Sequence, residues 1–257
     1  MNRNEDGFTI VELLVVMIVS SLLIGVITSF GLNYWGRTVG LSSAQQAFVS
    51  RLNAGDYLRN GVDSASGLIT QNDLPDAHVG SADPMDVTGT HWLTIHAVPT
   101  TITTGAPGVM TPLIYYTRPS VDTSKNIVLN GSVAYEDDIV LYLNGTTKQL
   151  LARTIINPNV SSNAARSTCP AAVATNACPA DIIVASDVSS MGMRYFSRSG
   201  NLINYQSSTD VSTGAFNGPD YPSVEIVEFT LNLYRKGELH NTPGTSNQTV
   251  IRVALRN

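Results

Sequence analysis

The hydrophobic residues of this chain are concentrated first in one long segment near the N-terminus. From Phe8 to Leu32 the sequence is apolar except for Glu12 and a few small polar residues, and no charged residue occurs between Glu12 and Arg37. A helix of about 20 apolar residues crosses the hydrocarbon core of a bilayer, and it satisfies its own backbone hydrogen bonds there. The pattern predicts a membrane-spanning helix over residues 8–33.

Beyond this segment, the hydrophobic positions take on the spacing of an amphipathic helix. Apolar residues recur at intervals of three and four, which places them on one helical face: Leu41, Ala44, Phe48 and Leu52. Asn60-Gly61 provides a stop, since glycine suits the left-handed conformation that ends many helices. We expect the helix to continue over residues 34–60 and to pack by this face on a folded domain.

Residues 61–257 are predicted to form that domain, and their pattern is mainly that of strands. Segments rich in β-branched and aromatic residues alternate with turn signals, and Asn144-Gly145 and Ser199-Gly200-Asn201 separate neighbouring segments as in hairpins. The predicted fold class is α+β, with a long N-terminal helix, membrane-spanning in its first half, packed on a mostly antiparallel β-sheet domain. The expected strands cover residues 91–98, 113–117, 138–143, 149–156, 181–184, 192–196, 202–205, 224–234 and 249–255.

Between the helix and the first strand, residues 62–87 are polar and rich in turns. Its acids include Asp73, Asp76, Asp83 and Asp86. Carboxylates are ligands for calcium, but the spacing of these four does not fit the EF-hand pattern. We therefore favour a solvated loop, with a calcium-binding loop as the alternative.

Composition and motifs narrow the classes of function. The formal net charge is −5, and lysine and arginine are not clustered as on a nucleic-acid-binding surface. The sequence contains none of the signatures of serine hydrolases, phosphate-binding loops, zinc peptidases or dinucleotide-binding folds. We expect no enzymatic activity, no cofactor, no metal and no direct contact with nucleic acid. An anchored hydrolase is left as an alternative that lacks a recognisable catalytic set.

The two cysteines of the chain, Cys169 and Cys178, lie close together, and a proline follows each. If the domain lies outside the cytoplasm, a disulfide between them closes a short loop and contributes about 2–3 kcal/mol. A metal site needs more ligands, and no histidine lies nearby. We favour the disulfide over two free thiols.

Glu12 is the unusual residue of the apolar segment. A carboxylate in a membrane helix is costly and indicates function by default, although the positive end of the helix dipole also favours an acid there. A cut between Gly7 and Phe8 would place a new amine four residues from Glu12, about 6 Å along the helix axis. Groups at this offset can pair between neighbouring helices, which keeps the charge compensated in an apolar bundle.

A removed secretory signal peptide is the alternative to an anchor. Such a peptide begins with basic residues and ends at a small-residue cleavage site. Here Arg3 is accompanied by Glu5 and Asp6, and no such site follows the apolar segment. The pattern favours a retained helix.

The segment from Gly7 to Val16, with the sequence GFTIVELLVV, resembles the class III signal of the type IV pilin and pseudopilin family. The resemblance implies a leader of residues 1–7, cleavage after Gly7 by a membrane prepilin peptidase, and N-methylation of Phe8. It also implies that Glu12 neutralises the N-terminal amine of a neighbouring subunit during filament assembly.

The C-terminal half resembles the larger minor pilins and the J-type pseudopilins, through strand-like stretches at 187–196, 227–233 and 252–257. This likeness implies a minor pilin or pseudopilin that helps to initiate or cap a type IV pilus, a competence pilus or a secretion pseudopilus. Its partners would be other pilins or pseudopilins through the N-terminal helix, the prepilin peptidase and the assembly platform.

The same resemblance implies a location. The chain would be a single-pass protein of the inner or cytoplasmic membrane, with its globular domain outside the cytoplasm, before it joins an envelope or surface filament. The alternative is a single-pass membrane-anchored adhesin that is not assembled into a filament and needs neither cleavage nor Glu12.

Overall fold

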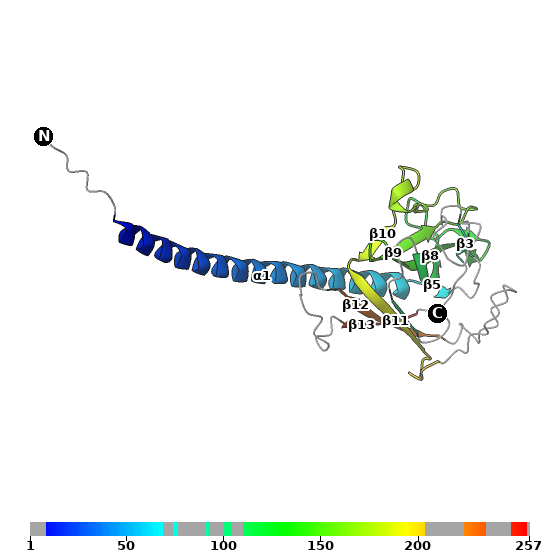
Figure 1. Cartoon of the computed structure of the whole chain (residues 1–257). Coiled ribbons are helices and arrows are strands. Elements are labelled where there is room, and N and C mark those ends of the chain that lie inside the picture. Colours follow the sequence, from blue (N-terminus) through cyan, green and yellow to red (C-terminus); the bar gives the residue numbers. More distant parts are fainter. Residues whose placement is uncertain are drawn as a thin grey trace. The chain divides into compact units, whose positions relative to one another are not determined.

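The computed structural model describes residues 9–68, 74–76, 91–92, 100–103, 110–203, 224–234 and 248–255. These residues divide into two compact units, with the boundary between Gln46 and Ala47. The first unit contains most of an N-terminal helix, and the second contains the end of that helix together with the strands (Figure 1). The predicted α+β fold class is confirmed.

Helix α1 runs without interruption over Ile10–Asp63, a length of 54 residues. Its apolar side chains from Ile10 to Phe30 are exposed. In the part of the chain that the structure describes, α1 is the one helix long and apolar enough to cross a membrane. The expected spanning segment and its continuation therefore lie on the same helix.

The face of α1 that is buried in the second unit differs from the predicted one. The predicted apolar stripe is exposed, with Phe48 at 59 %. The buried residues are instead Ala54, Leu58 and Val62, spaced by four. Ala54 follows Leu52 by two positions, which turns it by about 200° around the helix. Hydrophobicity favoured the larger side chains, but the side with the small Ala54 is the one that packs.

Gly61 lies inside the last turn of α1 and does not end the helix, contrary to the prediction. A Cβ atom at this position would lie 2.8 Å from the hydroxyl oxygen of Tyr116, on strand β5 (Met110–Pro119). The glycine therefore permits close approach of the helix to the sheet. Burial, followed by the neighbouring Tyr57 phenol, raises the pKa of Tyr116 well above its ordinary value.

The first sheet has five antiparallel strands in the order β1-β5-β8-β9-β10. Around β5 these are β1 (Gly67–Leu68), β8 (Glu136–Asn144), β9 (Gln149–Ile155) and β10 (Ile182–Ala185).

Strands β8 and β9 form the hairpin predicted at Asn144-Gly145. The side-chain oxygen of Asn144 accepts hydrogen bonds from the backbone N–H groups of Thr146 at 2.9 Å and Thr147 at 3.0 Å. Lys148, with φ 54°, adopts the left-handed conformation, and Gly145 does not. The turn is therefore held by an asparagine side chain, a known alternative to a glycine turn.

The second sheet has four antiparallel strands in the order β13-β12-β11-β4. They are β4 (Thr100–Thr103), β11 (Val188–Phe196), β12 (Ile226–Leu233) and β13 (Gln248–Ala254). The sequence did not predict β4. On the last strand, Ile251 and Val253 are buried while Arg252 is exposed, the alternation of a strand with one face toward the core.

Shorter elements complete the described chain. Strand β2 (Leu74–Pro75) pairs with β3 (His91–Trp92), and β6 (Leu129–Asn130) pairs with β7 (Val133–Ala134). The predicted second hairpin turns at Gly200, whose φ is +81°, and returns through a single bridge from Phe196 to Leu202. Residues 204 and 205 of the strand expected at 202–205 lie outside the described residues.

The end of α1 and both sheets contribute to one hydrophobic core. Strand β8 is central in its sheet and is buried along most of its length. Its two faces have different neighbours. Ile139 pairs with Tyr116, which lies next to α1, whereas Tyr142 points to the opposite face and contacts Trp92 of β3.

Candidate functional site

The first turn of α1 is closed by reciprocal hydrogen bonds between Thr9 and Glu12. The backbone N–H and the hydroxyl of Thr9 both donate to Glu12 Oε2 at 3.0 Å, and the Glu12 N–H donates to Thr9 Oγ1 at 3.3 Å. Because Thr9 immediately precedes the helix, this arrangement is a capping box. It was not predicted, although a threonine followed three positions later by a glutamate is the sequence signal for it.

Glu12 is therefore placed at the very start of the apolar helix, and it is exposed. The predicted cleavage and methylation site, Gly7 and Phe8, lies outside the described residues. Beyond Glu12 the exposed apolar side chains have no cover from the described chain. Such a surface is stable in lipid or against other apolar helices.

One side of this helix carries small residues at intervals of four, which the sequence analysis also missed. Ser21, Gly25 and Ser29 line a shallow groove. Its walls are formed by Leu22, Val26 and Phe30. The Ser21 hydroxyl donates to the Ile18 carbonyl at 2.8 Å, so it needs no further partner in an apolar environment. Small residues with this spacing allow the backbones of membrane helices to approach closely.

Residues 2–28 match the family model of the prokaryotic N-terminal methylation motif. The chain carries the class III signal of type IV pilins. No curated protein shows significant similarity to the chain. The motif supports a place in the type IV pilin and pseudopilin family, whose members interact with other pilin subunits and with prepilin peptidase. It points to a structural subunit rather than an enzyme, and together with helix α1 it fits anchoring in a membrane before assembly.

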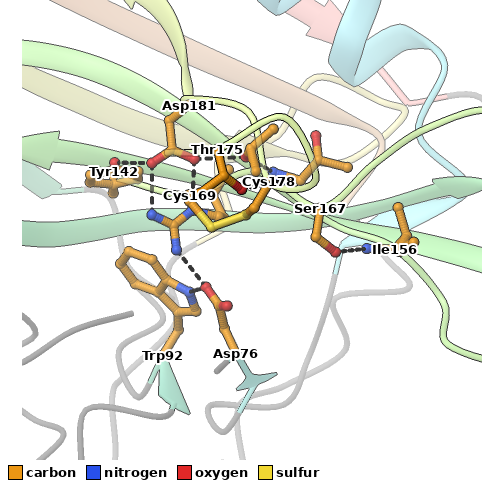
Figure 2. The surroundings of a disulfide bond; sticks show 12 residues. Asp76, Trp92, Tyr142, Ile156, Ser167, Cys169, Thr175, Cys178 and Asp181 are labelled. Atoms are coloured by element: carbon orange, nitrogen blue, oxygen red, sulfur yellow. Dashed lines mark hydrogen bonds and ion pairs between the residues drawn. A yellow bond between two sulfur atoms is a disulfide. The ribbon is translucent and has the colours of Figure 1, made fainter. Parts of the chain in front are cut away.

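The second unit contains a cluster of charged and aromatic groups around Arg153 of β9, whose side chain is fully buried. Its Nε and Nη2 atoms donate to the two oxygens of Asp181, each at 2.7 Å, and Nη1 donates to Asp76 Oδ2 at 2.7 Å. The pairing with Asp181 is the two-pronged geometry that makes guanidinium–carboxylate contacts strong. One buried cation is thus held between two carboxylates (Figure 2).

Two aromatic side chains complete this cluster. Trp92 Nε1 donates to Asp76 Oδ2 at 3.0 Å, and the Tyr142 hydroxyl donates to Asp181 Oδ2 at 2.6 Å. The Arg153 guanidinium lies 5.5 Å from the centre of the Trp92 ring and 5.9 Å from that of Tyr142. These distances are within the range of cation–π attraction. Each carboxylate is therefore bound by the arginine and by an aromatic donor.

A disulfide between Cys169 and Cys178 holds the segment that supplies Asp181. The Cys169 N–H donates to the Pro179 carbonyl at 2.8 Å, and the Asp181 N–H donates to the Cys169 carbonyl at 2.9 Å. The hydroxyl of Thr168 donates to Asp181 Oδ1 at 2.7 Å. The cross-linked loop therefore positions Asp181 against Arg153, and Figure 2 shows the disulfide beside the cluster.

Asp76 is not solvated, contrary to the expectation of a solvated loop. Asp76 is buried and pairs with Arg153, which lies 77 positions later in the chain. Asp73, Asp83 and Asp86 lie outside the described residues. Within the described ranges, no group of three potential metal ligands is found.

Arg153 stays charged and Tyr142 stays neutral at physiological pH. Burial by itself lowers the pKa of Arg153, but the hydrogen bonds and charges of Asp181 and Asp76 outweigh it and raise that pKa. Burial and the Asp181 carboxylate raise the pKa of Tyr142 well above its ordinary value. Groups that do not titrate near neutral pH are poor proton donors and acceptors for catalysis. The arrangement serves to hold separate segments of the domain together.

Proposed function

We propose that this protein is a minor pilin or pseudopilin, a structural subunit that helps to initiate or cap a type IV pilus or a related envelope filament. The observation that carries the proposal is the methylation motif of residues 2–28, which leads directly into the apolar part of α1. Residues 1–7 are the leader that prepilin peptidase removes. Residues 8–33 span the membrane and later assemble, residues 34–60 continue the helix, and residues 61–257 form the globular domain.

Glu12 is the residue that aligns neighbouring subunits in this proposal. Cleavage after Gly7 leaves an amine at Phe8, and the Glu12 carboxylate of one subunit pairs with the amine of another. In a bundle of apolar helices an unpaired charge is costly, so the paired arrangement is favoured over helices shifted along their axes. The hydrogen bonds from Thr9 hold the Glu12 carboxylate at the start of the helix before assembly.

The small residues of α1 supply a second contribution to assembly. Ser21, Gly25 and Ser29 reduce the thickness of one side of the helix, and a neighbouring helix can pack closely against it. The exposed apolar side chains around the groove then exchange contact with lipid for contact with protein. The assembly platform and other pilins are the partners of this helix, and the globular domain lies outside the cytoplasm.

The test follows the N-terminus and the location of the full-length protein in cells that assemble filaments. Mass spectrometry of sheared filaments and of the membrane fraction should find a chain that begins at N-methylated Phe8, at low abundance relative to the main filament subunit. A bulky replacement such as Gly7→Trp should leave the unprocessed precursor. An intact Met1 start in both fractions would instead indicate a membrane-anchored adhesin.

A pair of variants separates the role of Glu12 in assembly from its role in capping. Glu12→Val removes both, and it should leave membrane insertion intact while the protein is lost from filaments. Thr9→Ala removes the capping partner but keeps the carboxylate, so incorporation should stay close to normal. Equal incorporation of Glu12→Val and the native chain would contradict the pairing mechanism.

A further inference from the structure

The outward face of the second sheet carries two arginines that share one acid. Arg194 of β11, Glu228 of β12 and Arg252 of β13 lie directly opposite one another in the strand register. Arg194 Nη1 donates to Glu228 Oε1 at 3.2 Å, and Arg252 Nε donates to Glu228 Oε2. The Glu228 side chain is 5 % exposed, whereas those of Arg194 and Arg252 are 49 % and 65 % exposed.

Phe196 fixes the two guanidinium groups on this face. The guanidinium carbons of Arg194 and Arg252 lie 5.3 Å and 5.2 Å from the centre of the Phe196 ring. Each arginine is thus held by a carboxylate oxygen and by an aromatic ring, and Arg is well suited to both contacts. The remaining guanidinium N–H groups have no acceptor among the described residues. One positive charge is left in excess, with donors that are oriented in advance.

The same chain carries an acidic pair that has no cationic partner among the described residues. Glu136 and Asp138 lie two positions apart on β8 and therefore share a face of the first sheet. In the described part of the chain, neither side chain has a hydrogen bond or an ion pair. Burial and the like charges of Glu136 and Asp137 raise the pKa of Asp138 to about 6. Asp137, on the opposite face, is already occupied by Ser120, Asn157 and Asn163.

The two pairs are complementary in charge and similar in spacing. Residues two apart on a strand are separated by about 6.8 Å, and residues on strands flanking a common neighbour by about 9.6 Å. The long arginine side chains converge over Phe196, so the two guanidinium groups lie closer together than the strands that carry them. Guanidinium and carboxylate groups match as planar, two-pronged partners. No ion pair joins the two sites within the described chain.

We propose that the Arg194–Arg252 pair of one copy of this chain binds the Glu136–Asp138 pair of a second copy. Because the two surfaces are different, the contact is head-to-tail and leaves one free site of each kind at the ends of a row of copies. Such heterologous contacts build open helical arrangements rather than closed dimers. The inference rests on the proposed function in one respect, which is that both copies stand side by side in one membrane or filament.

Zero-length cross-linking of two co-expressed full-length copies tests this contact directly. The first copy carries Arg252→Lys together with Glu136→Gln and Asp138→Asn, and the second copy is native. Carbodiimide joins an amine to a carboxylate only when the two are in contact. Any link from the new lysine to position 136 or 138 must then connect two copies, because the first copy has no acid there. Mass spectrometry after proteolysis identifies the linked peptides.

The matched control moves the lysine to a neighbouring arginine. Arg198 is 89 % exposed and pairs only loosely with Glu225 at 3.9 Å. A first copy with Arg198→Lys and the same two neutral substitutions should give few links to positions 136 and 138. The expected ratio between the two experiments is about tenfold, which corresponds to about 1.4 kcal/mol. The yield of this cross-link should also fall as the salt concentration rises, because salt screens the charges that hold the two copies together.

The outcomes separate this inference from the proposed function. Links from position 252 to 136 or 138 of the second copy, in about tenfold excess over those from position 198, support the contact. Links only to Glu228 within one copy, or equal yields with Arg198→Lys, overturn it. Processing at Phe8 and incorporation into filaments are measured on the same cells. If both are normal and the link is absent, the inference fails and the proposed function stands.

Discussion

The buried cluster around Arg153 gives the most demanding test of the structure, through the substitution Asp181→Asn. This change keeps the size of the side chain and removes one charge. Asp181 accepts four hydrogen bonds, two from Arg153 and one each from Tyr142 and Thr168. In asparagine, an NH₂ group replaces one of the two carboxylate oxygens, and this group faces donors instead of acceptors. Arg153 then keeps only the Asp76 carboxylate as a charged partner.

The size of the expected loss of stability follows from the burial of these groups. Removing one partner of a buried ion pair lowers stability by about 3–5 kcal/mol, because the remaining charge is left without compensation. A domain of this kind is stable by about 5–15 kcal/mol in total. We therefore expect Asp181→Asn to remove about 3–5 kcal/mol from the free energy of unfolding, a large part of the whole.

The assay is denaturant unfolding of the full-length protein in a mild detergent, followed by the fluorescence of Trp92. This indole is fully buried and donates to Asp76, so it reports on the cluster. The chain has one other tryptophan, Trp35, and all variants are made with Trp35→Phe. The free energy comes from the linear dependence on denaturant concentration.

Asp137→Asn is the matched control. Asp137 is also buried and accepts three hydrogen bonds, but none of them comes from a cation. Its replacement should lower stability by about 1–3 kcal/mol, the effect of imperfect hydrogen bonding alone. If Asp181→Asn lowers stability by no more than this control does, the buried ion pair does not have the importance given to it here.

Three other perturbations have defined outcomes. Replacing Cys169 and Cys178 by serine should lower the free energy of unfolding by about 2–3 kcal/mol, measured by the same assay without reductant. The pKa of Asp138 is raised from 3.8 to about 6 in the folded state, so its protonated form stabilises the fold below pH 3.8 and this contribution is lost as pH rises through 6. The free energy of unfolding therefore depends on pH in this range, and Asp138→Asn should remove that dependence and raise stability at pH 7 by about 1–2 kcal/mol. This gain is smaller than the full pKa shift implies, because the side chain is partly exposed. An unchanged slope of the free energy of unfolding against pH, between pH 4 and 7, would refute the prediction. Gly61→Ala should lower thermal stability by about 1–3 kcal/mol through contact with the Tyr116 hydroxyl, and Tyr116→Phe in the same chain should recover most of it.

Local signals in the sequence predicted most of the longer elements of the fold. The apolar run predicted the first part of α1, and β-branched and aromatic segments predicted most of the longer strands. The hairpin at Asn144 was also predicted, because its turn depends on residues next to one another in the sequence. The methylation motif is local too, since the peptidase signal is a short linear segment.

Features that depend on packing could not be predicted in the same way. The buried side of α1 is chosen by the sheets that it meets, and a small side chain at Ala54 and none at Gly61 allow that approach. Hydrophobicity alone selected the opposite side. Arg153 was the available clue to the cluster, because a charged residue stands within a strand of mostly buried residues. Its partners lie 77 and 28 positions away, and no signal in the neighbouring sequence identifies them.

The order of Asp76, Arg153 and Asp181 along the chain has a consequence for incomplete chains. Asp76 is synthesised first, and Arg153 follows 77 positions later. Asp181 follows Arg153 by a further 28 positions, directly after the loop that the disulfide closes in an oxidising compartment. A chain that ends between Arg153 and Asp181 holds the cation with only one of its two acids. This part of the domain can therefore be packed as described only when residues 76 to 181 are all present, and the cross-link from Cys169 to Cys178 completes it.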